Sequence, residues 1–160
     1  MQRVTVICVG KLKEKFYAEA AAEYAKRLSR YCKLEIVELP EQRLPDTPSP
    51  AEIQQAAAKE ADAIRAKIPP SSYIVALCIE GRLHSSEELA RRLNTWSNRS
   101  EKRLVFLIGG SYGLHPSLKN EAGVQLSMSP MTFPHHLARV MLLEQLYRSF
   151  QILEGGKYHK

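Results

Sequence analysis

Two adjacent glycines follow an unbroken apolar run in the second half of the chain. Residues 104–114 read LVFLIGGSYGL, so five apolar residues lead into Gly109 and Gly110, and Gly113 comes three positions later. An apolar run without alternation is typical of a strand that is covered on both faces. Glycines at the carboxyl end of such a strand let the backbone approach a bound molecule closely. The segment therefore predicts a ligand loop.

The position of this loop limits the class of ligand. A dinucleotide-binding fold has its glycine motif after the first strand. Here the first expected strand, residues 4–9, ends at Gly10 and is followed by Lys11, Leu12 and Lys13. The chain also lacks a GK[ST] phosphate loop. These observations argue against dehydrogenases and nucleoside triphosphatases and place the ligand site in the C-terminal half.

Two further loops follow expected strands. Ile79, Glu80 and Gly81 end one strand, and residues 128–133, MSPMTF, follow another. Ligands of parallel sheets bind beyond the carboxyl ends of the strands, and methionine and phenylalanine offer polarizable, apolar surface to a ring or a thioether. We expect these loops to surround one small molecule together with the glycines. The alternative is that each is a simple turn whose methionines fill the core.

Strand and helix patterns alternate along the chain, which predicts an α/β fold with a parallel sheet and helices on both faces. Two capping signals support the helix assignments, Ser49-Pro50 with Glu52 and Ser85 with Glu88. Residues 40–50 contain four prolines and form the one long loop, of open role. The expected strands are 4–9, 34–39, 73–79, 104–108 and 124–128, and the expected helices are 16–33, 50–67, 86–98, 116–122 and 134–153.

Composition indicates one compact domain. The chain has 160 residues, of which 44% are hydrophobic and 25% charged. It contains no apolar run of membrane-spanning length and no signal-peptide pattern at its start, so we expect a cytoplasmic protein without a membrane partner. Cys8, Cys32 and Cys78 lack metal-ligand spacing and are expected to be core thiols, with no metal bound. The net charge of +6 favours an anionic partner such as RNA.

The final expected helix, residues 134–153, is apolar around more of its circumference than a surface helix needs. More than one neighbour must cover it. In a chain of this size a second subunit is the natural cover, so we expect a homodimer with a symmetric interface that includes this helix. The alternative is a helix that is wholly internal to one chain.

Four motifs in this order carry a resemblance to a known family. They are Gly10-Lys11-Leu12-Lys13, the IGGxxGL of residues 108–114, the MTFPH of residues 131–135 and the terminal Tyr158-His159-Lys160. Together they span essentially the whole chain. The sequence resembles the RlmH (YbeA-type) ribosomal RNA large-subunit methyltransferases of the SPOUT superfamily.

The resemblance implies a single SPOUT domain over residues 1–160, an α/β fold tied in a C-terminal trefoil knot in about residues 73–160, and a homodimer. It also implies transfer of a methyl group from S-adenosylmethionine to N3 of a pseudouridine in 23S rRNA, within the assembled ribosome. This reaction needs neither a metal nor a covalent enzyme intermediate, because positioning supplies most of the catalysis.

The resemblance also implies roles for particular residues. The tail residues Tyr158 and His159 should lie near the methyl acceptor. One weak base must remove the acceptor's proton, and His159 is the first candidate and His135 the second, with Tyr158 stacking on or orienting the base. The cofactor-binding residues are expected to be Leu77, Gly109, Gly110, Met128, Ser129, Pro130, Met131, Thr132 and Phe133.

Basic residues after strand ends are candidates for RNA contact. Lys11, Lys13 and Arg82 are candidates for phosphate binding, and Arg139 for RNA phosphate or the cofactor carboxylate. A lysine in such a position is more often a solvated surface charge, and this alternative stands for each of the two. Glu144 is expected to be an ion-pair partner of Arg139 or Arg148.

Two other functional classes remain open from the sequence. One is an enzyme of a different class with a nucleotide cofactor, and the other is a ribosome-associated binding protein without catalysis. The basic charge permits the second, but the cluster of cofactor-type loops would then have no purpose.

Overall fold

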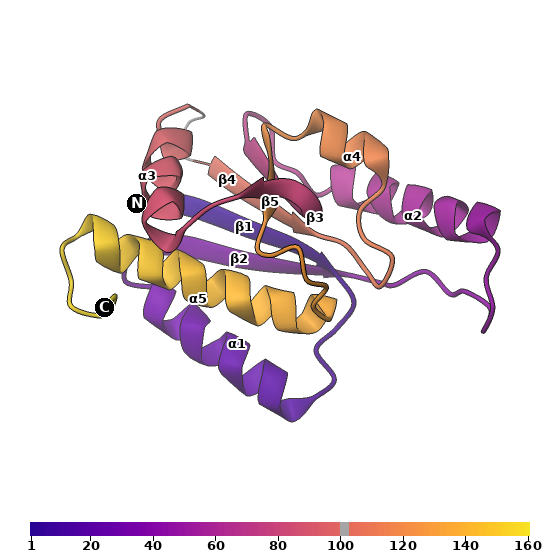
Figure 1. Ribbon diagram of the computed structural model, residues 1–160, viewed down its shortest axis with the longest axis horizontal. Coiled ribbons are helices and arrows are strands. Elements are labelled where there is room, and N and C mark those ends of the chain that lie inside the picture. The colour runs from indigo at the N-terminus through magenta and orange to yellow at the C-terminus, as the bar shows by residue number, and fades with distance from the viewer. Residues whose placement is uncertain (100–102) are drawn as a thin grey trace.

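The computed structural model describes residues 1–99 and 103–160 (Figure 1). Within them a parallel sheet has the strand order β2-β1-β4-β3-β5. The strands are β1 (Gln2–Val9), β2 (Cys32–Leu39), β3 (Tyr73–Leu83), β4 (Arg103–Ile108) and β5 (Val124–Ser127). The helices are α1 (Lys15–Leu28), α2 (Pro50–Arg65), α3 (Ser86–Ser97), α4 (Pro116–Glu121) and α5 (His135–Leu153). The predicted α/β class is confirmed.

Both faces of the sheet are buried. Along β1, Val4, Val6 and Cys8 belong to a core shared with α1, α3 and α5. The alternate residues Ile7 and Val9 belong to a second core shared with α2 and α4. Figure 1 shows α1 and α5 below the sheet and α2 and α4 on the opposite side. This two-sided burial is why β4, the middle strand, is apolar at every position from Leu104 to Ile108.

The first helix is shorter than its apolar pattern suggests. It ends at Leu28, and β2 begins at Cys32, two residues before the expected start. Tyr31, which continued the apolar stripe, lies in the intervening turn, where its ring stacks on Phe150 of α5 with centroids 5.6 Å apart. Tyr31 therefore continues the apolar stripe because it contacts α5, and not because it belongs to the helix.

Strand β3 runs on to Leu83, past the predicted end at residue 79. In β5, Leu126 pairs with Leu77 and again with Arg82, so residues 78–81 leave the ladder between these two pairings. The return to β5 brings Gly81 against the backbone of Gln125, where a Cβ on Gly81 would lie 2.7 Å from the carbonyl oxygen. Only glycine permits this approach without displacement of the strand.

The capping signals act at the expected helix starts. Ser49 accepts a hydrogen bond from the Glu52 N–H at 3.1 Å, and the Glu52 carboxylate accepts one from the Ser49 N–H at 3.1 Å. This is the reciprocal capping box that the sequence predicts. At the next signal, Ser85 accepts from the Glu88 N–H at 3.1 Å.

Helix α5 lies on the sheet between α1 and α3. Its Arg139 is only 2% exposed, and its guanidinium donates to the Glu38 carboxylate at 2.6 Å and to the Gly10 carbonyl at 2.8 Å. These bonds join the first turns of α5 to the carboxyl ends of β1 and β2. Two helices and the sheet therefore cover much of the apolar surface of α5 within one chain.

The other composition-based expectations concern cysteines and membranes. Burial raises the pKa of the Cys8 and Cys32 thiols to about 11, so both stay protonated, as core thiols do. Cys78 is partly buried, and burial raises its pKa as well. In the described part of the chain, no helix combines the length and the apolarity that crossing a bilayer requires.

The Arg139–Glu38 pair generates a stability prediction. Glu38→Ala leaves the buried guanidinium without its carboxylate, and we expect the free energy of unfolding to fall by about 3 kcal/mol. Urea denaturation followed by circular dichroism measures this. The matched control is Glu35→Ala on the same strand, whose carboxylate is in no ion pair among the described residues, and this change should cost well under 1 kcal/mol. Equal losses in the two variants would contradict the anchoring role of the pair.

Candidate active site

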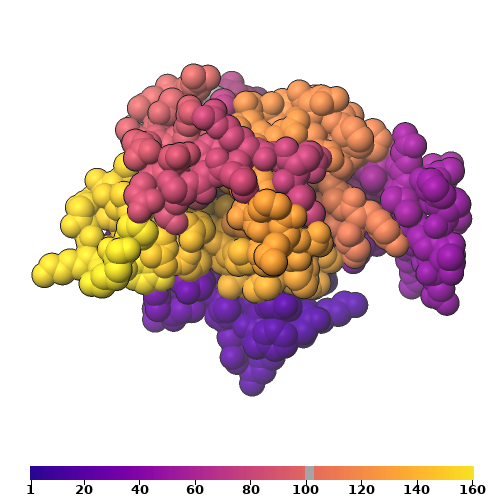
Figure 2. All heavy atoms as spheres, in the orientation of Figure 1, coloured from indigo at the N-terminus to yellow at the C-terminus, as the bar shows by residue number. Residues whose placement is uncertain are grey.

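A pocket of about 330 Å³ lies at the carboxyl ends of β4 and β5, beside the middle of β3. Its walls are residues 77–80 of β3, residues 108–114 at and after the end of β4, six of residues 126–133 around the end of β5, Lys119 of α4 and the start of α5. The three loops that the sequence analysis singled out therefore surround one cavity. Figure 2 shows the orange segment after β5 at the surface, below the crimson segment that ends β3 and above the indigo start of α1.

Most of the predicted cofactor-binding residues line this pocket. Pro130 does not line it, although it belongs to the same loop, and it is exposed. Met131 is 71% exposed, so it lies open to solvent next to the cavity. The predicted residues that line the pocket are Leu77, Gly109, Gly110, Met128, Ser129, Met131, Thr132 and Phe133.

The glycines shape the loop after β4. The Gly113 N–H donates to the Gly110 carbonyl at 3.0 Å and closes a tight turn, with Gly113 at φ +80°. Gly109 packs against the far side of this turn, and a Cβ there would lie 2.7 Å from both the Gly113 carbonyl oxygen and the Leu114 nitrogen. The turn fits only because Gly109 has no side chain.

The proline-rich segment 40–50 supports the same loop from behind. Glu41, at its start, accepts a hydrogen bond from the Ser111 hydroxyl at 3.0 Å. Glu60 of α2 accepts one from the Gln42 N–H at 3.0 Å. Both carboxylates line a second cleft, of about 330 Å³, on the other side of residues 111–113. No sequence pattern indicates this role, because the contact between Glu41 and Ser111 joins residues 70 positions apart.

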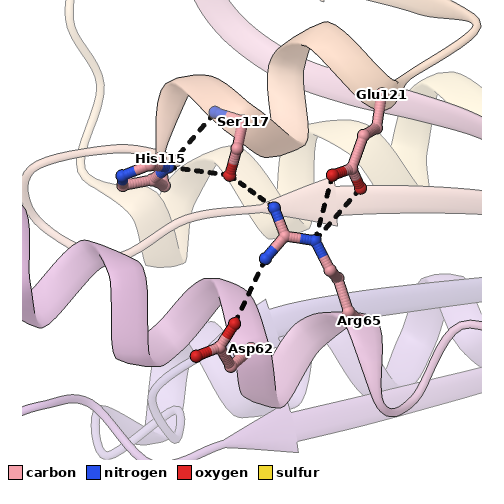
Figure 3. Close-up of polar contacts among 5 residues, drawn as sticks. All are labelled: Asp62, Arg65, His115, Ser117 and Glu121. Atoms are coloured by element: carbon pink, nitrogen blue, oxygen red, sulfur yellow. Dashed lines mark hydrogen bonds and ion pairs between the residues drawn. The ribbon is translucent and has the colours of Figure 1, made fainter.

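A polar network holds α4, which follows the glycine loop, against α2 (Figure 3). Arg65 of α2 donates to the Glu121 carboxylate at 3.1 Å, to Asp62 at 3.3 Å and to the Ser117 hydroxyl. His115 caps α4, since its Nδ1 accepts the Ser117 N–H at 3.1 Å. The glycine loop is therefore fixed at both ends, by β4 and by the capped start of α4.

An ion pair stands at one wall of the pocket. Lys119 of α4 contacts the Glu80 carboxylate at 2.5 Å, and both residues line the cavity. The hydrogen bond from Lys119 holds the pKa of Glu80 below its usual range, so this carboxylate is ionised near neutral pH. Glu80 belongs to one of the predicted ligand loops, whereas no sequence motif marks Lys119.

His135 is the catalytic candidate that the structure places at the pocket. Its Nε2 is buried and has no hydrogen-bond partner among the described residues. Burial, and then the charge of His136, lower the pKa of His135. The imidazole is therefore neutral near pH 7 and available to accept a proton.

The tail residues Tyr158 and His159 lie away from the pocket and contact the second half of α5. The Tyr158 hydroxyl donates to Glu144 at 3.0 Å, and Arg148 also binds this carboxylate. His159 Nδ1 lies 3.0 Å from the Arg148 guanidinium and its Nε2 lies 2.6 Å from Glu87. Because a guanidinium group can only donate hydrogen bonds, Nδ1 of His159 accepts the one from Arg148. The Nε2–H group of His159 then donates a hydrogen bond to the Glu87 carboxylate. Of the two predicted partners for Glu144, the structure selects Arg148.

The pocket and the tail are not brought together within one chain. His135 is the first residue of α5, and Arg148, which holds the tail, is thirteen residues further on. At the rise of an α-helix the two are about 20 Å apart. Figure 1 shows the C-terminus beside one end of α5 and the loop after β5 at the other.

The candidates for RNA contact are divided. Lys11, Lys13 and Arg82 are exposed. Arg139 is buried and bonded to Glu38 and Gly10, which corrects the expectation that it contacts RNA or a cofactor: its guanidinium has no exposed surface to offer.

As to metals, no group of three or more His, Cys, Asp or Glu side chains suited to an ion occurs in the described residues.

The tail network generates a titration prediction. Burial and the hydrogen bond to Glu144 raise the pKa of Tyr158 to about 12, so its hydroxyl donates and does not act as a base near neutral pH. We expect Glu144→Gln to lower this pKa, because the negative charge that disfavours phenolate is lost. NMR titration of ¹³C-labelled tyrosine, assigned with Tyr158→Phe, measures it. The exposed Glu154→Gln should leave the pKa unchanged, and an equal effect of both variants would refute the assignment.

A family model described as "Predicted SPOUT methyltransferase" matches residues 2–159. The match covers the sheet, the three pocket loops, α5 and the tail up to His159. It agrees with the five-stranded parallel sheet and its flanking helices. The chain therefore belongs to the SPOUT methyltransferase family.

Proposed function

We propose that this protein is an S-adenosylmethionine-dependent methyltransferase of the RlmH group, which methylates N3 of a pseudouridine of 23S rRNA in assembled cytoplasmic ribosomes. The observation that carries the proposal is the pocket of about 330 Å³ enclosed by β3 and the carboxyl ends of β4 and β5. Its place in a SPOUT chain and the four sequence motifs support the choice of cofactor and substrate.

The residues of the pocket fit S-adenosylmethionine. Gly109 lets the loop after β4 fold closely onto Gly113 and Leu114, and this tight turn places the backbone of residues 108–114 along the pocket wall. Leu77, Met128 and Phe133 supply an apolar, polarizable wall for an adenine ring and a methionine side chain. When bound, the cofactor supplies an electrophilic methyl group on its sulfonium.

The acceptor nitrogen must lose a proton as the N–C bond forms. His135 is neutral and lies at the pocket, and its buried Nε2 has no hydrogen-bond partner among the described residues, so in this proposal His135 accepts the proton. Tyr158 orients the nucleobase by donating a hydrogen bond, because its raised pKa keeps the phenol protonated near neutral pH. His159 has both ring nitrogens engaged by Arg148 and Glu87, so it can take a proton only after release from Arg148.

The separation of tail and pocket supports a homodimer. Within one chain about 20 Å of α5 lies between His135 and the tail, so a tail that acts on the base must come from a second copy. Part of α5 stays half-buried, including Met141 and Glu144, which leaves surface for such a partner. The trefoil knot in about residues 73–160 is also part of the proposal, and the double pairing of Leu126 with β3 is compatible with it.

The decisive experiment is transfer of labelled methyl from S-adenosylmethionine to ribosomes of a strain that lacks this protein. Assembled ribosomes, free subunits and naked rRNA are compared, and the product nucleoside is identified by mass spectrometry. We expect methylpseudouridine in assembled ribosomes. Cofactor binding without label would overturn the substrate, and the absence of both would favour a ribosome-associated protein without catalysis.

Two adjacent glycines provide a matched pair of variants for the cofactor arm of this experiment. Gly109→Ala drives a methyl group into backbone, whereas a Cβ on Gly110 meets the flexible Glu41 carboxylate at 3.2 Å. We expect Gly109→Ala to weaken binding of S-adenosylmethionine at least tenfold by calorimetry, and Gly110→Ala to change it little. Similar affinities in both variants would mean that the cofactor binds elsewhere.

Complementation tests the contribution of the second copy. One variant, Gly109→Ala, has a defective pocket and an intact tail, and the other, Tyr158→Ala with His159→Ala, has the reverse. If the tail acts on the partner's pocket, each mixed dimer regains one of its two sites, and mixing the inactive variants restores methyl transfer. Continued inactivity after verified subunit exchange would show that each tail serves its own chain.

A further inference from the structure

A separate cleft of about 200 Å³ lies beside α3 and the start of β5, and both ends of β3 contribute to its lining. We call it the basic cleft and define it by Tyr73, Arg82, His84, Arg92, Trp96 and Arg99. Neither the motifs nor the family match draws attention to it. Only Arg82 was among the candidates for RNA contact in the sequence.

The arginines come to the basic cleft from two elements. Arg92, Trp96 and Arg99 follow one another at spacings of four and three along α3 and its end, so they share a face. Arg82 lies at the end of β3, where it pairs with Leu126 of β5. Residues 78–81 leave the ladder and β3 then pairs with β5 again, so Arg82 lies beside α3, the helix that follows β3.

The floor of the basic cleft is aromatic and closely packed. The Trp96 ring is 3% exposed and stacks on Tyr73 with centroids 5.8 Å apart. Tyr73 covers the start of β5 so closely that a Cβ on Gly123 would lie 2.6 Å from its ring. A buried indole has no free face for a base, so the cleft presents charge over a firm floor and not a stacking platform.

The charge of the basic cleft is not balanced locally. Its lining contains three arginines and a histidine but no carboxylate, whereas the pocket contains Glu80 and the cleft behind the glycine loop contains Glu41 and Glu60. A further cleft, between β1 and β2, contains Glu35 beside its basic residues. Among the described residues, no ion pair involves Arg82, Arg92 or Arg99.

We propose that the basic cleft binds backbone phosphates of the RNA strand that flanks the methylated nucleotide. Guanidinium forks match phosphate oxygens in geometry as well as in charge. Contacts of this kind position a nucleic acid without reading its sequence, which agrees with the lack of an exposed aromatic face. The inference rests on the RNA substrate of the proposed function.

The basic cleft lies on the same sheet edge as the pocket. β5 is the edge strand, with Gly123 at the basic cleft before it and Met128 at the pocket after it. Val124 lines the basic cleft and Leu126 lines the pocket, so the two linings come within about 7 Å of each other along this strand. An RNA strand that lies along this edge therefore contacts the basic cleft while one of its nucleotides enters the pocket.

The test measures binding of a fluorescein-labelled single-stranded RNA by anisotropy over a series of KCl concentrations. We expect the double variant Arg92→Ala/Arg99→Ala to bind at least tenfold more weakly than the unchanged protein. The slope of log affinity against log salt should be shallower by about 1.4, which corresponds to two lost phosphate contacts. Arg92→Lys/Arg99→Lys keeps the charge but not the fork and should recover only part of the affinity.

The matched control is Arg30→Ala/Lys59→Ala, which removes the same charge from exposed positions outside the basic cleft. An equal loss in this control would overturn the proposal, because net charge alone would then explain the binding. The proposal also fails if poly-L-glutamate competes as well as RNA, since the cleft would then not distinguish phosphate from carboxylate. Displacement by inorganic phosphate at the same ionic strength would mean a site for the free anion and would likewise overturn it.

Two measurements distinguish a failure of this inference from a failure of the proposed function. Affinity for S-adenosylmethionine, measured on the Arg92→Ala/Arg99→Ala variant, should equal that of the unchanged protein because neither residue lines the pocket. Unchanged RNA affinity with intact methyl transfer would refute the basic cleft alone. If ribosomes are never methylated, the RNA-binding loss is still measurable by itself.

Discussion

The buried guanidinium of Arg139 is the constraint on which the rest of the structure depends. It joins α5 to Glu38 at the end of β2 and to the Gly10 carbonyl after β1. An uncompensated charge at this depth costs several kcal/mol, so α5 has only one favourable position on the sheet. The loop of residues 128–134 leads directly into α5, and the placement of this helix therefore closes the pocket.

The pocket is made mainly of backbone and apolar side chains, and its rigidity comes from residues behind it. Glu41 holds Ser111 on one side of the glycine loop, and Arg65 holds the start of α4 on the other. A site that works by positioning needs such support, because a small displacement of the reacting groups costs much of the rate. The proline-rich segment thereby gains a structural purpose next to the site.

Helix α5 also separates the two sets of candidate catalytic residues, which lie at its opposite ends. A neutral histidine lies at its first residue, and the tail with its tyrosine is bound near its end through Glu144 and Arg148. The arginines of the basic cleft come from α3 and its end and from the end of β3, and none of them lines the pocket. In the proposed function these parts act together only when a second copy and an RNA strand are present.

The sequence by itself determined the α/β class, the helix starts at Ser49 and Ser85, and the three loops at the strand ends, because these depend on local periodicity, capping and glycine placement. Tertiary structure decided which charges meet. Arg139 finds Glu38, 101 positions earlier, and is thereby lost to RNA, while the extension of β3 carries Arg82 to α3. Such pairings depend on strand register and burial between distant segments, which no local pattern encodes.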